Sequence, residues 1–104
     1  MLQPSLRRTP LVVVASEQAM MADEVARRLR STGLVAYATH SVQGCLRVAT
    51  SVGPDIVLLD PALPARLERL LRAHPVSGRA QLLHLAASDA SRAAANLLTP
   101  ASAA

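Results

Sequence analysis

Short apolar runs alternate with longer amphipathic segments along most of this chain. The runs at residues 11–14, 35–39, 56–59 and 81–86 have the lengths of strands, and the first is rich in β-branched side chains. Between these runs, apolar residues recur at the three- and four-residue spacing of helices. Strict alternation of strand and helix predicts an α/β fold, a doubly wound parallel sheet with helices on both faces.

The predicted helices have recognisable starts and stops. The first covers residues 18–32, and Ser41 is expected to cap a second helix that Gly53 closes. A third helix is predicted over residues 65–74 and a fourth over residues 88–98. The apolar stripes expected to face the sheet contain Met21, Val25 and Leu29 in the first helix and Leu67, Leu70 and Leu71 in the third.

The clearest chemical signal lies in residues 54–64, which read Pro-Asp-Ile-Val-Leu-Leu-Asp-Pro-Ala-Leu-Pro. Four apolar residues between two acids predict a strand that is buried on both faces, so that Asp60 follows its carboxyl end. In open α/β sheets this edge is where ligands bind and chemistry occurs. Asp60 is therefore the leading candidate for a functional residue.

This segment resembles the third strand of the receiver domain of two-component response regulators. That family reads Pro-Asp, four apolar residues and a second Asp, followed by a short loop with a proline. The last Asp of the family's run accepts a phosphoryl group, and Asp60 occupies that place here. The resemblance covers residues 10–98 and implies a bacterial, flavodoxin-like domain with strand order 2-1-3-4. Residues 1–9 and 99–104 are expected to be flexible termini.

Much of the chemistry of that family is missing from this sequence. Receivers carry two adjacent acids after the first strand, which help to hold a divalent cation, and here those places read Ala15-Ser16. Only Ser16 and the following Glu17 are expected as remnants of the acidic pocket, and the sequence has no lysine for the family's place after a fifth strand. Because Mg²⁺ usually takes protein carboxylates directly, we expect no cofactor, and at most a weak Mg²⁺ site.

Three functions remain open for this pattern. The first is a degenerate receiver, or pseudo-receiver, that is no enzyme and regulates other proteins by contact, with Asp60 only capping a loop or helix. The second is a phosphorylatable receiver that uses Asp60 with an atypical metal site. The third is a small nucleotide-binding module at the same edge, which the lack of glycines in the loops after the first and third strands disfavours. We expect the first function, because phosphoryl transfer depends on cations that neutralise charge.

The end of the pattern predicts an interaction surface. Nothing after residue 98 resembles a fifth strand, so apolar surface should remain beside the fourth strand and the fourth helix. Exposed sheet edges and large apolar patches tend to mark contacts with other chains. We therefore expect a homodimer or a protein partner on this side. The residues expected on the surface are Leu83, Leu85, Leu97 and Leu98.

Composition and charge refine this picture only slightly. The chain has 104 residues, of which 51% are hydrophobic, and a net charge of +4, which fits one small domain. Its arginines are interspersed with acids on the predicted helices, so we do not expect direct nucleic-acid binding. The single Cys45 is expected to be buried and inert, as suits a cytoplasmic protein, and no membrane span is recognised. His84 lies inside the fourth strand, where burial would require a hydrogen-bond partner or an uncovered sheet face.

Overall fold

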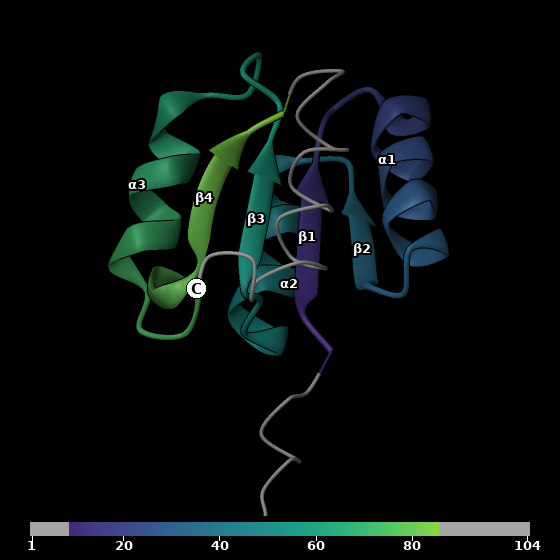
Figure 1. The fold of residues 1–104 in the computed structure, drawn as a ribbon. Coiled ribbons are helices and arrows are strands. Elements are labelled where there is room, and N and C mark those ends of the chain that lie inside the picture. Colours follow the sequence, from purple (N-terminus) through teal and green to yellow (C-terminus); the bar gives the residue numbers. More distant parts are fainter. Residues whose placement is uncertain (1–8, 86–104) are drawn as a thin grey trace, which may run out of the picture.

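The four apolar runs form one parallel sheet in the structure, a computed structural model that describes residues 9–85. The strands are β1 (Leu11–Ala15), β2 (Val35–Thr39), β3 (Ile56–Leu59) and β4 (Gln81–His84). They lie in the order β2-β1-β3-β4, and every pairing between them is parallel (Figure 1). The strand order and pairing confirm the doubly wound α/β fold that the alternating pattern predicts.

Helices connect the strands within the described residues. They are α1 (Ala19–Ser31), α2 (Val42–Val52) and α3 (Ala65–Ala73), and a short 3₁₀ helix, η2 (Ser77–Arg79), precedes β4. None of the helices in this part of the chain is long and apolar enough to cross a bilayer. The fourth helix predicted over residues 88–98, together with Leu97 and Leu98, lies outside the described residues.

The ends of α2 follow from two residues that the sequence singles out. The Ser41 hydroxyl accepts a hydrogen bond from the backbone N–H of Gly44 at 2.9 Å, which satisfies a donor in the first turn. Gly53 adopts a left-handed conformation with φ of +63°, which a residue with a side chain adopts only at a cost. The predicted N-cap and stop are both confirmed.

Two apolar layers hold the sheet between the helices. Alternate strand residues point to opposite faces, so Val12 and Val14 face α1, whereas Val13 and Ala15 face α2 and α3. In Figure 1, α2 lies behind the sheet and α3 stands beside β4. The buried residues of these layers include Ala22, Ala26, Leu29, Ile56 and Leu58 on the α1 side, and Cys45, Ala49, Val57, Leu59, Leu67 and Leu71 on the other.

Two of the predicted apolar stripes differ from the observed helix faces. In α1 the buried residues are Ala22, Ala26 and Leu29, while Met21 is 37% exposed. The small alanines let the helix backbone approach the sheet closely, and that approach rotates Met21 toward solvent. In α3, Leu67 and Leu71 are buried as predicted, but Leu70 is 46% exposed because it lies about a quarter turn from the line joining them.

The short connection before β4 contains the single turn of η2. The buried hydroxyl of Ser77 donates to the carbonyl of Leu71 at 2.7 Å, which ties this turn to the end of α3. Gly78 lies so close to this helix that an added Cβ would stand 2.7 Å from the carbonyl oxygen of Arg72. Only a residue without a side chain fits that position.

Candidate functional site

The loops that follow β1 and β3 meet at the carboxyl edge of the sheet. Parallel pairing places Ala15 beside Leu59, so the residues that follow them, Ser16 and Asp60, are neighbours. The backbone N–H of Asp60 donates to the carbonyl of Ala15 at 2.9 Å, and that of Ser16 donates to the carbonyl of Thr39 at 3.1 Å. The sheet itself therefore fixes where both side chains begin, at the edge that the sequence predicts.

Both carboxylate oxygens of Asp60 accept hydrogen bonds from the protein. Oδ2 accepts from the Ser16 hydroxyl at 2.8 Å, and Oδ1 accepts from the backbone N–H of Ala62 at 2.9 Å. The residue is only 8% exposed. A buried carboxylate must replace its hydrogen bonds to water with hydrogen bonds from the protein, and Ser16 and Ala62 provide them. The bond to Ala62 holds the loop after β3 in a tight turn, because the N–H of Leu63 also donates to the Asp60 carbonyl at 2.9 Å.

Ser16 links the two loops through its hydroxyl. The side chain is fully buried, donates to Asp60, and accepts a hydrogen bond from the backbone N–H of Gln18 at 3.0 Å. Gln18 immediately precedes α1, so one hydroxyl connects the start of α1 to the end of β3. Glu17, the other expected remnant of an acidic pocket, is exposed and takes no part in this buried pair.

These residues do not fit a divalent cation. A receiver-type site would require carboxylates at the end of β1 and in the loop after it. Here Ala15 presents a methyl group, Ser16 presents a hydroxyl group that already bonds Asp60, and Glu17 is exposed outside the buried pair. Asp60, the only buried carboxylate within residues 9–85, already has a donor on each oxygen. Within residues 9–85, no three His, Cys, Asp or Glu side chains are grouped so that they could hold a metal ion.

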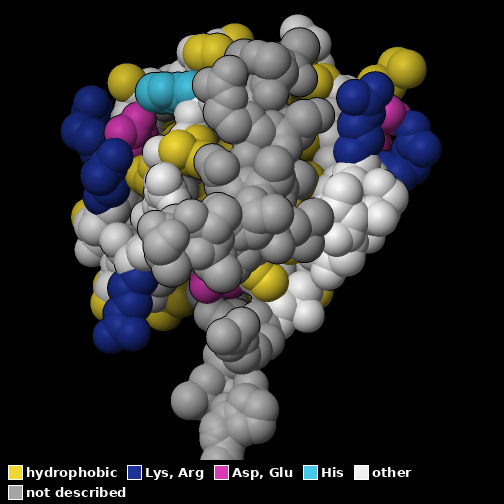
Figure 2. Space-filling model, viewed as in Figure 1, with side chains coloured by type: hydrophobic (Ala, Val, Ile, Leu, Met, Phe, Trp, Pro, Cys, Tyr) yellow, Lys and Arg dark blue, Asp and Glu magenta, His cyan; other side chains and the backbone are white. Residues whose placement is uncertain are grey.

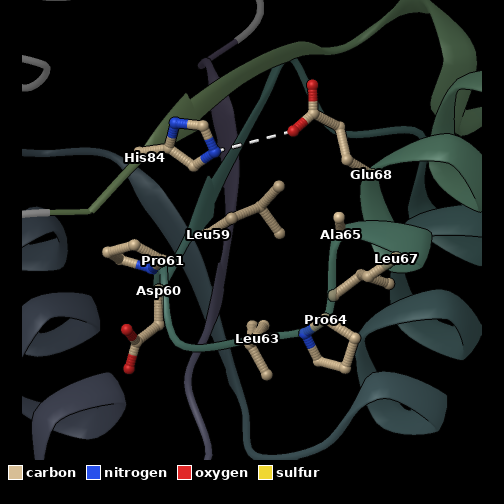
Figure 3. Close-up of a pocket in the computed structure, with 9 residues that line it drawn as sticks. All are labelled: Leu59, Asp60, Pro61, Leu63, Pro64, Ala65, Leu67, Glu68 and His84. Atoms are coloured by element: carbon tan, nitrogen blue, oxygen red, sulfur yellow. Dashed lines mark ion pairs between the residues drawn. The ribbon is translucent and has the colours of Figure 1, made fainter.

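A small pocket of about 130 Å³ lies beside the Asp60 loop, between β4 and α3. His84 of β4 and Glu68 of α3 face each other across it, with Nε2 and Oε1 3.5 Å apart (Figure 3). Figure 3 also shows the Asp60 carboxylate pointing away from this pair. The Glu68 pKa is lowered, chiefly because the carboxylate accepts hydrogen bonds from Arg72. Asp60 itself is among the residues that line the pocket, which therefore adjoins the Ser16–Asp60 pair.

His84 is exposed although it lies in a strand. Its side chain is 67% exposed, so the imidazole needs no buried hydrogen-bond partner. Two of the residues expected on an interaction surface lie beside His84, Leu83 within β4 and Leu85 directly after it. Leu83 is half-buried, and Leu85 is 5% exposed and belongs to the apolar layer on the α1 side. Leu85 itself therefore contributes little accessible area.

Within residues 9–85, the arginines are spread over α1, α2, α3 and η2. In the view of Figure 2, arginines lie over α1 and over α3, at opposite sides of the molecule, with acidic side chains among them. In α1, Glu24 pairs with Arg27 and Arg28, and in α3, Glu68 pairs with Arg72. Paired charges of this kind are typical of helix faces that contact water. A surface that binds a phosphate backbone instead carries a continuous set of basic side chains.

Cys45 is fully buried between α2 and the sheet, as the sequence predicts. Burial raises the pKa of its thiol to about 11, so the reactive thiolate is scarce at neutral pH. The residue therefore contributes to packing rather than to nucleophilic chemistry.

Comparisons with known proteins support the fold. No protein-family model matches the sequence, and no curated protein matches it. Among solved structures, the chain is similar to the crystal structure of a response regulator from Desulfuromonas acetoxidans, with a TM-score of 0.65 and 15% sequence identity. The match covers 86% of this chain and 76% of that chain. At this level of identity the likeness concerns the fold, and this chain has a receiver-like fold.

Sequence reasoning locates the site but misses two of its contacts. It places Ser16 and Asp60 at one edge of the sheet without predicting that the hydroxyl would donate to the carboxylate. The strand-end positions of these two residues were the available signal, because neighbouring parallel strands bring them together. The approach of Glu68 to His84 had no comparable signal, since it depends on how α3 lies against β4.

Proposed function

We propose that this chain is a degenerate receiver domain that acts by contact with other proteins and does not transfer phosphoryl groups. The observation that carries the proposal is the buried hydrogen bond from Ser16 to Asp60. The receiver-like fold supports a role in response-regulator-type signalling. The Ser16–Asp60 pair argues that the site serves the structure of the domain and not chemistry.

Phosphoryl acceptance makes demands that this edge does not meet. A carboxylate oxygen must be free to attack, and cations must neutralise the charge of the transferring group. Here each carboxylate oxygen of Asp60 already accepts a hydrogen bond from the protein, and the neighbouring loop adds no second buried carboxylate, because Glu17 is exposed. The sequence has no lysine at all that could contact the phosphoryl group. Each deficiency lowers the rate, and together they remove the family's mechanism.

Asp60 instead has a positioning role in this proposal. Through Ser16 it holds the loop that leads into α1, and through Ala62 it holds the loop that leads into α3. The carboxylate therefore fixes the two loops that border the carboxyl edge of the sheet.

The surface that we propose for contact is the outer side of β4. The N–H groups of Gln81 and Leu85 donate toward β3, so the alternating backbone groups of Leu82 and His84 face away from it. Within residues 9–85, no strand pairs with that outer side. A second copy of the chain or another protein would cover this edge together with Leu83, Leu97 and Leu98.

Incubation with acetyl phosphate and Mg²⁺, followed by intact-mass measurement, tests the absence of chemistry. We expect no gain of a phosphoryl group, while a competent receiver in the same tube is modified. A gain in the wild type that disappears in Asp60→Asn would overturn the proposal.

Sedimentation tests the contact surface separately. We expect wild-type protein to self-associate or to bind its partner, and Leu97→Asp with Leu98→Asp to lose that association. Wild-type protein that stays monomeric at high concentration, with partner binding unaffected in the double variant, would contradict the assignment of this surface.

A further inference from the structure

The outer edge of β2 presents backbone groups that no strand within residues 9–85 pairs with. The N–H of Val35 donates to the carbonyl of Pro10 at 3.2 Å, and the carbonyl of Thr39 accepts from Ser16 at 3.1 Å. The backbone groups of successive residues in a strand point to opposite sides. Since Val35 and Thr39 bond toward β1, Ala36 and Ala38 direct their N–H and C=O groups away from it. Such a row is a template on which another strand can pair.

The side chains of β2 do little to discourage that pairing. The strand contains no charged residue and no proline, two of the devices by which exposed edges are protected. Val35 is 39% exposed and Tyr37 is 41% exposed, so two large side chains with β-propensity stand on one face of this edge. The sequence of β2 by itself describes a strand that would accept a neighbour.

Protection comes instead from the neighbouring helix. Arg30, in the last turn of α1, donates from Nε to the carbonyl of Ala36 at 3.0 Å. This carbonyl is one of the outward-facing groups near the middle of the edge. A strand that paired here would have to displace the guanidinium and its hydrogen bond. Arg27 and Arg28 of the same helix pair with Glu24 and make no such bond to the sheet.

We propose that Arg30 closes the outer edge of β2 to strand addition by another copy of this chain. The guanidinium satisfies the Ala36 carbonyl and places a charge where the backbone of an incoming strand would lie. This inference does not rest on the proposed function, because it concerns the opposite edge of the sheet from β4. The tests below therefore compare the self-association of each variant with that of the wild-type protein.

The first test compares Arg30→Ala and Arg30→Met with Arg28→Ala by sedimentation over a range of concentrations. Arg30→Met retains the apolar stem of the side chain, and Arg28→Ala removes an equal charge from the same helix. We expect both Arg30 variants to self-associate about tenfold more tightly than wild type, the factor that corresponds to one hydrogen bond of roughly 1.4 kcal/mol. Arg28→Ala should sediment as wild type does. Equal association of wild type and both Arg30 variants would overturn the proposal.

The second test asks whether any new association uses β2. In the Arg30→Ala background, Ala38→Pro removes an N–H that faces away from β1, so the pairing with β1 keeps its donors. We expect this change to abolish the added association. Amide exchange followed by NMR gives an independent readout, because the N–H of Ala36 should become protected when Arg30→Ala associates. Association that persists with Ala38→Pro, or that leaves Ala36 unprotected, would show that Arg30 does not guard this edge.

Discussion

The hydroxyl of Ser16 donates a 2.8 Å hydrogen bond to Oδ2 of Asp60, and both residues are buried at the ends of neighbouring strands. A carboxylate held in this way is a structural acceptor whose donors belong to the protein. The same bond explains why the edge keeps a buried acid although the only acid in the loop after β1, Glu17, is exposed. Removing either side chain should therefore lower the free energy of unfolding, rather than weaken the binding of a ligand.

Ser16→Ala should destabilise the domain. The change leaves Oδ2 of a buried carboxylate without its donor, which typically costs about 1–3 kcal/mol. Urea unfolding followed by circular dichroism measures the loss. Ser31→Ala is the matched control, because Ser31 is exposed and its hydroxyl donates only to the carbonyl of Arg28. Its effect should stay within about 0.5 kcal/mol. Equal stability of Ser16→Ala and wild type would mean that the buried bond contributes nothing.

Ser16→Asp should create a dependence on Mg²⁺ that the wild type lacks. Two carboxylates would then lie about as close as the present 2.8 Å contact, and their repulsion should lower the melting temperature without a cation. A cation that binds only the folded state raises it again. Ser16→Asn is the uncharged control of equal size. Thermal melts with and without Mg²⁺ distinguish the three proteins, and a wild-type protein that Mg²⁺ stabilises would contradict the loss of the site.

Cys45 should make stability fall at alkaline pH. Burial raises its pKa from an ordinary value of 9.0 to about 11, so the unfolded chain loses this proton first as the pH rises. The contribution is complete below pH 9 and is lost between pH 9 and about 11. At pH 10 the loss relative to pH 8 should be about 1.4 kcal/mol. Cys45→Ala should lack this component, and identical pH profiles for the two proteins would show that the thiol does not resist ionisation.

Arg72→Gln should raise the pKa of Glu68 toward its ordinary value. The hydrogen bonds from Arg72 are the largest cause of the lowered pKa, and His84 contributes less. NMR titration of the Glu68 side chain reads the pKa directly. Arg69→Gln removes a charge from the same helix at a residue that is not among the causes of the shift, and it should leave the pKa in place. Equal shifts in both variants would assign the effect to net charge instead of to the hydrogen bond.

Much of the fold could be predicted because its signals are local. The apolar run before Asp60, the Ser41 cap and the Gly53 stop each determine their own conformation. Strand order followed from the resemblance to receivers, since alternation alone predicts only parallel pairing. Helix faces were less predictable: the sequence cannot tell that α1 approaches the sheet through Ala22 and Ala26, which turns Met21 outward.

The candidate site could be predicted in position but not in chemistry. The sequence places Asp60 and Ser16 at strand ends, and the sheet brings strand ends together. Whether a hydroxyl then donates to the carboxylate depends on side-chain directions that the sequence does not contain. The same limit applies to Arg30, whose bond to Ala36 depends on the crossing of α1 over the edge of β2.

Backbone amide NMR offers the sharpest test of the role assigned to Asp60. The amides of Ser16, Asp60 and Ala62 report on the carboxylate from both of its donors, and they can be followed while Mg²⁺ and then acetyl phosphate are added. We expect their chemical shifts to remain unchanged, as in an Asp60→Asn control treated in the same way. A saturable shift of these three amides in the wild type, absent from Asp60→Asn, would show that Asp60 binds a cation or accepts a phosphoryl group.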